Sequence, residues 1–440
     1  MAQFYRPKKT TVKRQRINAQ PVVGLDHQGR GIVRHQGQSY FVAGVVPGDE
    51  IDYTITGKHQ ATCERIRQSS EQRVAPPCKY YQQCGGCDLQ HLSVTDQRAH
   101  KQRVVGELLQ KYGAISATEM LPIIAAEGWH YRQRARLAVH WNPRQQKLTL
   151  GFRAKQSKTI IAVEQCLTLS AALSELLRPL QHALAQLDLV KQLGHVELID
   201  ATVPQVLLHL HGAVTELSAA DQQRLMQLSE QQQLQVWWRV GEALPSPLSP
   251  EQELPRYPSA SGSIEFYPGD FLQANAALNL QLVETAVAWL DPNTSDQILE
   301  CFAGAGNFSL KIAASGAQLT AVEGVPSMVE RLQAQAQQRG LNIKAVHADL
   351  DQPWRRQKWA QPAFNKAFLD PARAGARQVC EELTKAPAVD TIVYVSCAPD
   401  TFARDAGVLQ QGGFKLRKVQ VVDMFPQTHH IELIGLFSKE

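Results

Sequence analysis

A single cysteine at the end of a short apolar run is the residue with the clearest chemical potential. Residues 393–395 are β-branched or aromatic, and Ser396, Cys397 and Pro399 follow directly. This pattern predicts a strand that ends at the thiol, the place where open α/β sheets carry reacting groups. The alternative is a core cysteine, because unpaired Cys is among the most buried residue types. The rest of the chain has to decide between the two interpretations.

A carboxylate near the C-terminal end is the candidate partner of this thiol. Glu432 is followed by the apolar run 433–437, which predicts a buried strand. A carboxylate at such a position is unfavourable unless it is paired or functional, so Glu432 is a candidate general base. His429 and His430 are the alternative bases. A helix predicted to begin near Pro399 would place its N-terminus close to the thiol and help to ionise it.

A second group of cysteines has the spacing of a metal or cluster site. Three follow a Pro-Pro pair as C-x5-C-x2-C, with two glycines in the second gap, and the fourth is distant. Glycines let the backbone turn tightly enough for neighbouring thiolates to converge. Cys63 is a weaker fourth ligand because it lies in a strand-like pattern. The spacing leaves zinc and an iron–sulfur cluster open. The four residues are Cys78, Cys84, Cys87 and Cys166.

A glycine turn between a predicted strand and a predicted helix indicates a cofactor site. Residues 297–301 read as the strand, and the turn contains Gly304 and Gly306. The next strand ends in Glu323, an acid that can accept both ribose hydroxyls of an adenosine. A dinucleotide motif would carry a third glycine where this chain has Ser309. That departure favours S-adenosylmethionine over NAD.

Two later acids extend this pattern. A third strand ends near Asp349, which is placed to reach an adenine amino group, and a fourth ends at Asp370-Pro371. An Asp-Pro pair after the fourth strand also favours S-adenosylmethionine.

Composition excludes several classes of protein. The chain has 440 residues, of which 44% are hydrophobic and 20% charged, with a formal net charge of +5. It contains no apolar run near the ~18 residues that span a bilayer and no secretory signal, so we expect a cytoplasmic protein without a membrane partner. In that compartment the eight cysteines are expected to be ligands, nucleophiles or core residues rather than disulfides. The mild basicity permits a nucleic-acid partner.

Three segments are candidate RNA contacts. Residues 1–20 form a basic arm, for which a disordered tail is the alternative. Glycine-cut alternating segments between residues 22 and 68 predict a small β-barrel of a type that binds single-stranded nucleic acid. Its turn at residues 44–49 resembles that of the TRAM domain. A predicted hairpin places Arg132, Arg134 and Arg136 on one strand face, with Lys155 and Lys158 nearby, and a solvated edge strand is the alternative.

Taken together, these motifs resemble those of the RNA uracil-C5 methyltransferases, in particular the TRAM-containing, iron–sulfur branch that acts on 23S ribosomal RNA. The resemblance covers essentially the whole chain. Glu300 stands where Asp is more usual, Ala303 replaces a common Cys, and Asp349 stands where relatives can carry Asn. The motifs are the four cysteines and residues 271–275, 302–308, 369–375, 394–399 and 430–432.

The resemblance implies a mechanism and a set of site residues. Cys397 is the nucleophile that adds to C6 of the target uracil, and Glu432 is the base that removes the C5 proton. The four cysteines hold a 4Fe–4S cluster. The partner is 23S ribosomal RNA, and we expect a monomer with no obligate protein partner. The residues implied to contact S-adenosylmethionine are Gln273, Phe302, Asn307, Glu323, Asp349 and Asp370.

The expected fold is α/β, a Rossmann-like S-adenosylmethionine-dependent methyltransferase domain with two accessory domains. The expected segments are a basic arm (1–20), a TRAM-like β-barrel (21–70), a central α+β iron–sulfur domain (71–264) and the catalytic domain (265–440). Prolines between residues 245 and 258 mark the last boundary.

Three other functions remain open. The chain could methylate another rRNA site or a tRNA uridine, although tRNA enzymes of this family generally lack the barrel and the cluster cysteines. A DNA cytosine-C5 methyltransferase would also use a thiolate, but its Pro-Cys-Gln context is missing. A non-catalytic iron–sulfur RNA-binding protein would need neither Cys397 nor Glu432.

Overall fold

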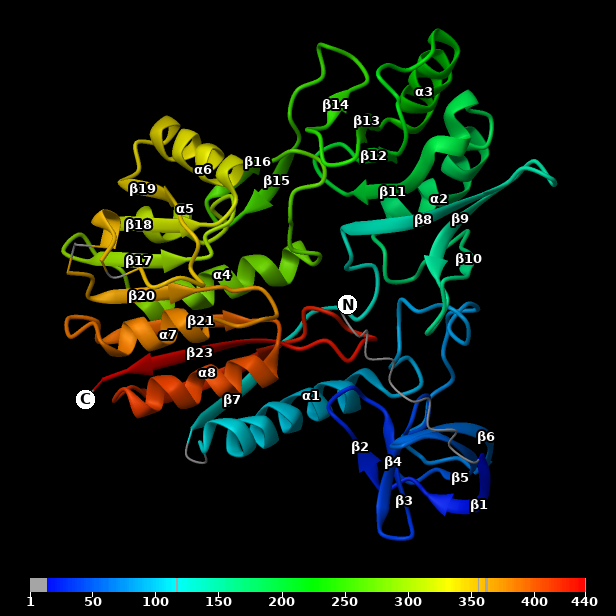
Figure 1. Ribbon diagram of the computed structural model, residues 1–440, viewed down its shortest axis with the longest axis horizontal. Coiled ribbons are helices and arrows are strands. Elements are labelled where there is room, and N and C mark those ends of the chain that lie inside the picture. The colour runs from blue at the N-terminus through cyan, green and yellow to red at the C-terminus, as the bar shows by residue number, and fades with distance from the viewer. Residues whose placement is uncertain (1–13, 116–117, 355, 361–362, 440) are drawn as a thin grey trace, which may run out of the picture. The chain divides into compact units, whose positions relative to one another are not determined.

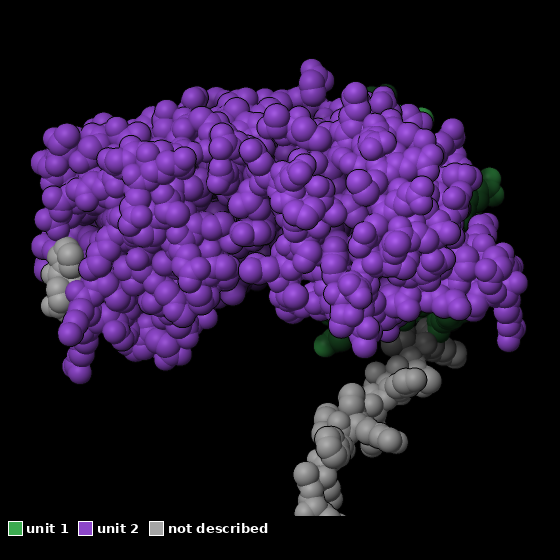
Figure 2. Space-filling view, turned by 90° about the horizontal axis from the view of Figure 1, so that it is seen from above, with its two compact units in different colours: residues 1–81, 87–104, 427–429 green, residues 82–86, 105–426, 430–440 purple. Residues whose placement is uncertain are grey.

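The computed structural model describes residues 14–115, 118–354, 356–360 and 363–439 (Figure 1). The chain forms two compact units, coloured separately in Figure 2. Unit 1 comprises residues 1–81, 87–104 and 427–429, and unit 2 comprises residues 82–86, 105–426 and 430–440. Most of the predicted basic arm, residues 1–13, lies outside the described residues. The four-segment division predicted from sequence stays a prediction.

Unit 1 contains a six-stranded sheet that surrounds one apolar cluster. The strand order is β1-β5-β6-β4-β3-β2, and Val33, Val42 and Tyr53 are buried in the cluster. The strands predicted at residues 40–42 and 51–55 are confirmed, and Cys63 lies in β6. The strands are β1 (Gln15–Pro21), β2 (Gly24–Leu25), β3 (Gly31–His35), β4 (Gln38–Val42), β5 (Glu50–Gly57) and β6 (Gln60–Gln68).

Helix α1 (Val94–Leu108) follows and continues into a π-helical turn, Leu109–Gly113. Val104 and Val105 of α1 are buried.

Unit 2 begins with a seven-stranded sheet in the order β10-β9-β8-β11-β12-β13-β14. The predicted arginine hairpin is β8 and β9, and helices α2 and α3 pack on this sheet and on each other. The proline-rich stretch is not simply a loop, because it carries β14 and β15. The elements are β8 (Arg134–Asn142), β9 (Lys147–Arg153), β10 (Ile160–Ala162), α2 (Ala171–Leu184), a 3-10 helix (Asp188–Gln192), β11 (Leu193–Ile199), β12 (Gln205–Leu210), α3 (Ala219–Gln232), β13 (Gln235–Val240) and β14 (Ser246–Pro247).

The second sheet of unit 2 has eight strands in the order β19-β18-β17-β20-β21-β23-β22-β7, and it carries the candidate site. The first five strands are parallel, β23 is antiparallel to β21 and β22, and β7 is parallel to β22. The strands are β7 (Glu119–Ile124), β17 (Gln297–Cys301), β18 (Gln318–Glu323), β19 (Ile343–His347), β20 (Lys366–Leu369), β21 (Thr391–Ser396), β22 (Lys415–Val422) and β23 (Glu432–Ser438). A separate hairpin, β15 (Arg256–Ser259) and β16 (Gly262–Glu265), precedes β17 in the chain.

Helices cover both faces of the eight-stranded sheet (Figure 1). α4, α5 and α6 share an apolar cluster with inward residues of β17, β18, β20, β21 and β23. α8 packs on the other face, where Phe402 contacts the rings of Tyr394 and Phe437. No helix in the described part of the chain is long and apolar enough to cross a membrane. The helices are α4 (Ala276–Leu290), α5 (Ser309–Ala313), α6 (Pro326–Gln338), a 3-10 turn (Lys358–Ala360), α7 (Arg377–Thr384) and α8 (Pro399–Gln411).

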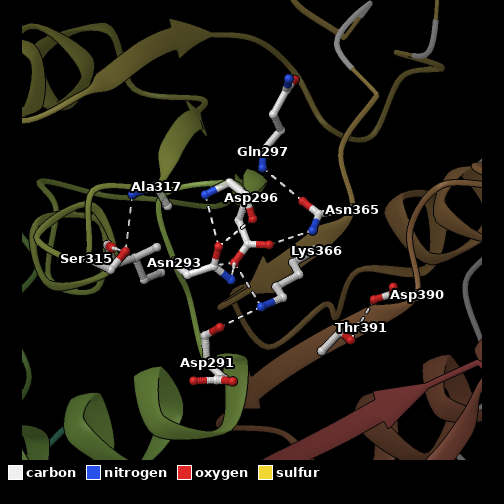
Figure 3. A network of polar contacts seen from close by, with 12 residues as sticks. Asp291, Asn293, Asp296, Gln297, Ser315, Ala317, Asn365, Lys366, Asp390 and Thr391 are labelled. Atoms are coloured by element: carbon white, nitrogen blue, oxygen red, sulfur yellow. Dashed lines mark hydrogen bonds and ion pairs between the residues drawn. The ribbon is translucent and has the colours of Figure 1, made fainter.

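A polar network fastens the amino ends of β17 and β20 (Figure 3). The buried Asp296 carboxylate accepts hydrogen bonds from Asn293, from Asn365 Nδ2 at 2.6 Å and from Lys366 Nζ at 2.9 Å. Asn365 in turn accepts the backbone N–H of Gln297 at 2.9 Å. Burial opposes ionisation of Asp296, but the hydrogen bonds from Asn365 and Lys366 outweigh it and lower its pKa. These hydrogen bonds therefore connect the amino ends of β17 and β20.

Candidate active site

Strand register places the predicted nucleophile and the predicted base on neighbouring strands. Ser396, the last residue of β21, pairs with Leu433 on β23. Cys397 directly follows Ser396 and Glu432 directly precedes Leu433, so the two residues adjoin the last pair of this ladder. The Glu432 carboxylate is close enough to raise the pKa of the Cys397 thiol. Two residues selected separately from the sequence are thus brought to one point.

The Cys397 thiol is half-buried in an acidic environment. Burial, followed by the carboxylates of Glu432 and Asp370, raises its pKa to about 11, while the Arg373 guanidinium acts in the opposite direction. α8 does begin at Pro399, as predicted. However, the expected ionising effect of its N-terminus is smaller than the combined effect of burial and the carboxylates. The unliganded site therefore holds a neutral thiol near pH 7.

The two carboxyl groups beside the thiol also resist ionisation. Glu432 is 3% exposed, and burial together with the neighbouring Asp370 raises its pKa well above the usual value. Asp370 follows β20 directly, and burial raises its pKa to about 7. A cation that entered this site would favour the ionised forms of all three groups.

The glycine turn after β17 has the geometry of a close backbone approach. Gly306 has φ +104°, and a Cβ atom there would lie 2.7 Å from the Leu332 side chain. Phe302 has φ +65°, a left-handed conformation that is unusual for a residue with a side chain. Strained backbone of this kind concentrates at ligand sites.

Glu323 connects this turn to the end of β18. Its Oε2 accepts the Gly304 N–H and its Oε1 accepts the Val325 N–H, both at 2.9 Å. The carboxylate is thereby fixed at the carboxyl edge of the sheet, where each oxygen retains lone pairs for a ligand hydroxyl.

Gln273 and Asn307 lie beside the turn and belong to a small amide network. Asn307 exchanges two hydrogen bonds with Asn279 of α4, at 2.9 and 3.0 Å. Gln273 is 9% exposed, and its carbonyl accepts the Tyr257 hydroxyl at 3.4 Å. Asn279 and Tyr257 were not selected from the sequence. The sequence signal for Asn279 was a polar residue near the start of the largely apolar segment 276–290.

Asp349 is the predicted ligand that lies farthest out. It is exposed after β19, and its Oδ1 accepts the Asp351 N–H at 2.9 Å, which closes its own turn. The predicted adenine contact of Asp349 stays a prediction.

Glu300 was noted in the sequence as a departure from the family pattern, but no role was assigned to it. It is 1% exposed in β17, and burial raises its pKa to about 8, although the nearby Ser309 side chain opposes the rise. The nearby carboxylates of Asp370 and Glu323 contribute further to this rise. Glu300 therefore adds to the concentration of acids at this edge.

The two alternative bases have other partners. In unit 1, His429 pairs through Nδ1 with the carboxylate of Asp88, and its N–H donates to the same group at 2.8 Å. In unit 2, the His430 ring packs edge-on against Phe425, with ring centroids 5.9 Å apart. Glu432 is the candidate whose carboxylate acts on Cys397.

The four cysteines that were predicted to hold a cluster form no disulfides and are of intermediate exposure. In unit 2 the Cys84 sulfur accepts the Gly86 N–H at 3.4 Å, and the Cys166 sulfur lies 3.3 Å from the Thr168 hydroxyl. Thiols with hydrogen-bond donors nearby suit an iron–sulfur or zinc site. Within the described residues, no three His, Cys, Asp or Glu side chains are grouped closely enough to hold a metal ion.

The arginine row needs a correction. Arg132 precedes β8 rather than lying in it, and its Nε donates to the Arg134 carbonyl at 2.8 Å. Arg134 Nε donates to the buried Glu197 at 2.7 Å. Arg136 is the exposed member of the row. The alternation pattern could not reveal the acid on β11 that opposes this strand face.

The fold and the site together define a class. The order of the parallel strands, the reversed β23 and the glycine turn with acids after β17, β18 and β20 form an S-adenosylmethionine-dependent methyltransferase fold. The model of the tRNA (Uracil-5-)-methyltransferase family matches residues 94–350 and 354–440. The chain belongs to this family of uracil-C5 RNA methyltransferases.

Relatives in three bacteria sharpen the resemblance. The chain is 40% identical to a 23S rRNA (uracil(1939)-C(5))-methyltransferase RlmD of Shewanella sediminis, with both chains covered completely. It is 37% identical to the Pectobacterium atrosepticum protein of that name, with 99% of this chain and 98% of the other covered. For the Pseudomonas putida protein of the same name the identity is 38%, with 98% and 95% covered.

A solved structure shows the same fold over nearly the whole chain. The tRNA (uracil-54, C5)-methyltransferase of Pyrococcus abyssi, in complex with S-adenosyl-L-homocysteine, superimposes with a TM-score of 0.71 at 20% identity. The superposition covers 95% of this chain and 99% of that one. At this identity the superposition shows a shared fold.

Proposed function

We propose that the protein transfers the methyl group of S-adenosylmethionine to C5 of a uridine in 23S ribosomal RNA, uracil 1939 by analogy with its relatives. The observation that carries this proposal is that Cys397, which follows β21, and Glu432, the first residue of β23, adjoin the last pair of the ladder between these strands, where the Glu432 carboxylate acts on the thiol. The relatives' names support the choice of RNA.

The residues divide the reaction into two steps. The Cys397 sulfur bonds to C6 of uracil, and the electron pair of the C5–C6 bond moves toward C5, which then bonds to the donor methyl group as S-adenosyl-L-homocysteine leaves. Glu432 takes the C5 proton, the C5–C6 double bond re-forms and the sulfur departs. The positive sulfonium of the donor would favour ionisation of Cys397, Glu432 and Asp370, whose pKa values are raised by burial.

The proposed donor contacts follow from the same geometry. Glu323 is placed for the ribose hydroxyls, and Gln273, Phe302, Asn307 and Asp370 surround the turn. Asp349 is the proposed adenine partner.

RNA that contains 5-fluorouridine tests this chemistry, because fluorine cannot be removed from C5 as a proton. The wild-type protein should form a covalent adduct, stable on denaturing gels, when S-adenosylmethionine is present. Cys397→Ala should form none. With ordinary uridine RNA, Glu432→Gln should accumulate the adduct without releasing product. Adduct formation by Cys397→Ala, or normal turnover by Glu432→Gln, would remove the proposal.

A tRNA uridine is the second candidate substrate, because the family model and the Pyrococcus abyssi enzyme carry tRNA in their names. Mapping 5-methyluridine in ribosomal and transfer RNA from cells that lack the protein separates the two. Loss from 23S RNA alone supports the first proposal. Loss from another rRNA position or from tRNA replaces it.

We further propose that Cys78, Cys84, Cys87 and Cys166 hold a 4Fe–4S cluster that helps to order their loops or to bind RNA. Support comes from their spacing and from their half-exposed thiols, which form no disulfides. Purification without oxygen should yield a brown protein with about four iron and four sulfide per chain. Zinc in place of iron would refute the cluster.

The remaining proposals concern the RNA contacts, the oligomeric state and the location of the protein in the cell. The unit 1 sheet and Arg136 are proposed RNA contacts, so that affinity for RNA should fall steeply with salt. We propose that the protein acts as a monomer in the cytoplasm, where its ribosomal RNA substrate resides.

A further inference from the structure

The segment that leads into β23 is held by residues of unit 1. Residues 427–429 belong to that unit, together with residues 87–104. The Gln427 carbonyl accepts the backbone N–H groups of Asp88 and Leu89 at 3.1 and 3.0 Å. The Gln427 N–H donates to Gln97 Oε1 at 2.8 Å, and Gln97 Nε2 donates back to Gln427 Oε1 at 3.1 Å. Asp88 also accepts the His429 N–H at 2.8 Å and pairs with its imidazole.

These contacts hold a backbone conformation that the segment would not adopt alone. Gln427 has φ +69°, in the left-handed region that favours glycine. Such a conformation is unfavourable for a residue with a side chain and persists where the surroundings enforce it. Gln97 and Gln427 are each 1% exposed, and Gln97 Nε2 also donates to the Leu89 and Leu92 carbonyls. The segment is therefore fixed from both its backbone and its side chains.

The position of this segment matters because of the residue that follows it. Two residues, His430 and Ile431, separate His429 from Glu432, the first residue of β23. A base that removes a proton has to lie within hydrogen-bond reach of that proton. A displacement of about 1 Å at a catalytic group can reduce the rate about 100-fold.

We propose that Asp88 and Gln97 are positioning residues for Glu432: they fix residues 427–429 and so set the point at which β23 begins. The inference rests on the proposed role of Glu432 as the base. Asp88 and Gln97 would thus affect proton removal although they lie more than 300 residues before the segment that they contact.

The proposal selects one step of the reaction. Addition of Cys397 and methyl transfer do not require Glu432, whereas loss of the C5 proton does. Loosening residues 427–429 should therefore slow release of the methylated RNA more than formation of the adduct. A general loss of structure would reduce both steps together.

Single-turnover reactions of the full-length chain with a 23S RNA transcript and S-adenosylmethionine test this difference. Adduct is followed on denaturing gels and released 5-methyluridine by mass spectrometry. Asp88→Ala and Gln97→Ala should release product about 10- to 100-fold more slowly, with adduct formation within about twofold of wild type. Asp88→Asn keeps an acceptor for the His429 N–H and should restore most of the release rate.

Asp26→Ala is the matched control. Asp26 is likewise a carboxylate of unit 1 that accepts backbone N–H groups and pairs with a basic side chain, but it is buried whereas Asp88 is half-buried, and its partners are Gln28 and Arg30. Its release rate should equal that of wild type. Gln97→Ala is needed beside Asp88→Ala, because Asp88 adjoins Cys87, a proposed cluster ligand.

The outcomes separate this proposal from the proposed function. If wild type forms no Cys397-dependent adduct, the proposed function fails. If wild type forms one but both variants release product normally, or lose adduct formation and release in parallel, the positioning role is wrong. Hydrogen exchange gives an independent measurement: faster exchange of residues 427–434 in an otherwise protected variant is expected, and unchanged exchange there would also overturn the proposal.

Discussion

At the amino ends of β17 and β20, Asp296 accepts hydrogen bonds from Asn293, Asn365 and Lys366, and its pKa is lowered. At the carboxyl ends of the same two strands, burial raises the pKa of Glu300 to about 8 and that of Asp370 to about 7. The chain thus places the same functional group in opposite electrostatic settings at the two ends of one pair of strands.

This difference separates stability from function. A buried acid with amide and ammonium partners stabilises the folded state at neutral pH, whereas buried acids without a cation oppose folding there. The second arrangement is useful where a cationic ligand completes the site. The sulfonium of the proposed methyl donor carries a positive charge. Binding of the donor would therefore stabilise the ionised acids at the carboxyl ends of the strands, whereas Asp296 at the amino ends is stabilised by side chains of the protein itself.

Removing the paired acid should give the largest effect. Asp296→Ala leaves the Lys366 ammonium and the Asn365 amide without their partner, and should lower the free energy of unfolding by about 3–5 kcal/mol at pH 7. Because the folded-state pKa is depressed, this stabilisation is present above the unfolded value of 3.8 and is lost as pH falls through the folded value. Urea unfolding followed by tryptophan fluorescence measures it.

The control for this variant is an exposed ion pair. Glu381→Ala breaks the surface pair with Arg377 and should change stability by less than about 1 kcal/mol. The turnover of folded Asp296→Ala should equal that of wild type. A loss of turnover without a loss of stability would contradict the structural role of this end.

Neutralising an unpaired acid should act in the opposite direction. The folded-state pKa of Glu300 is raised, so its favourable contribution is present below the unfolded value of 4.5 and is lost as pH rises to about 8. Glu300→Gln removes this dependence and should be more stable than wild type by about 2–4 kcal/mol at pH 8, and equal at pH 4.5. Parallel stability curves for the two proteins between these pH values would show that Glu300 ionises without penalty.

Asp370→Asn should weaken function rather than stability. Loss of a charged contact to the donor is worth about 1.5–3 kcal/mol, so kcat/KM for S-adenosylmethionine should fall about 10- to 100-fold. Asp390→Asn makes the same change at the exposed amino end of β21 and should leave kcat/KM unchanged. Steady-state kinetics with calorimetric titration of the donor measure both. Equal values of kcat/KM for the two variants would show that the acids at the carboxyl and amino ends of the strands do not differ in function.

The smallest effect concerns the thiol. Glu432→Gln removes a negative charge that raises the pKa of Cys397, so the midpoint of its alkylation by iodoacetamide should move to lower pH by about one unit. Arg373→Gln should move the midpoint upward, because the guanidinium opposes that rise. Mass spectrometry of the Cys397 peptide over the alkaline range reports the midpoint. Movement of both midpoints in one direction would contradict this charge arrangement.

Local patterns predicted the strand ends at the candidate site better than their surroundings. A β-branched run before Cys397 and an apolar run after Glu432 each predict a strand end, and β21 does end at Ser396 while β23 begins at Glu432. The antiparallel insertion of β23 and the edge strand β7 depend on pairings between distant segments, which periodicity does not contain. The pKa of Cys397 was misjudged for a related reason, since the helix N-terminus is local but the acids come from β20 and β23.

Patterns of charged and polar residues in the sequence predicted side-chain partners least well. Arg134 was selected as one of three arginines on a strand face, but its guanidinium is used by Glu197 of β11. Asp88 and Gln97 carried no signal, because their partners lie more than 300 residues further along the chain.

The pairing of β7 with β22 has a consequence for how the protein is made. The Gln420 amide on β22 donates to the Pro122 carbonyl on β7 across a separation of 298 residues. At about 5–20 residues per second, β7 leaves the ribosome roughly 15–60 s before its native partner exists. Throughout that interval a strand edge is available for wrong pairings. Synthesis of this protein therefore includes a long window in which a chaperone bound near residues 119–124 would protect the yield of folded chain.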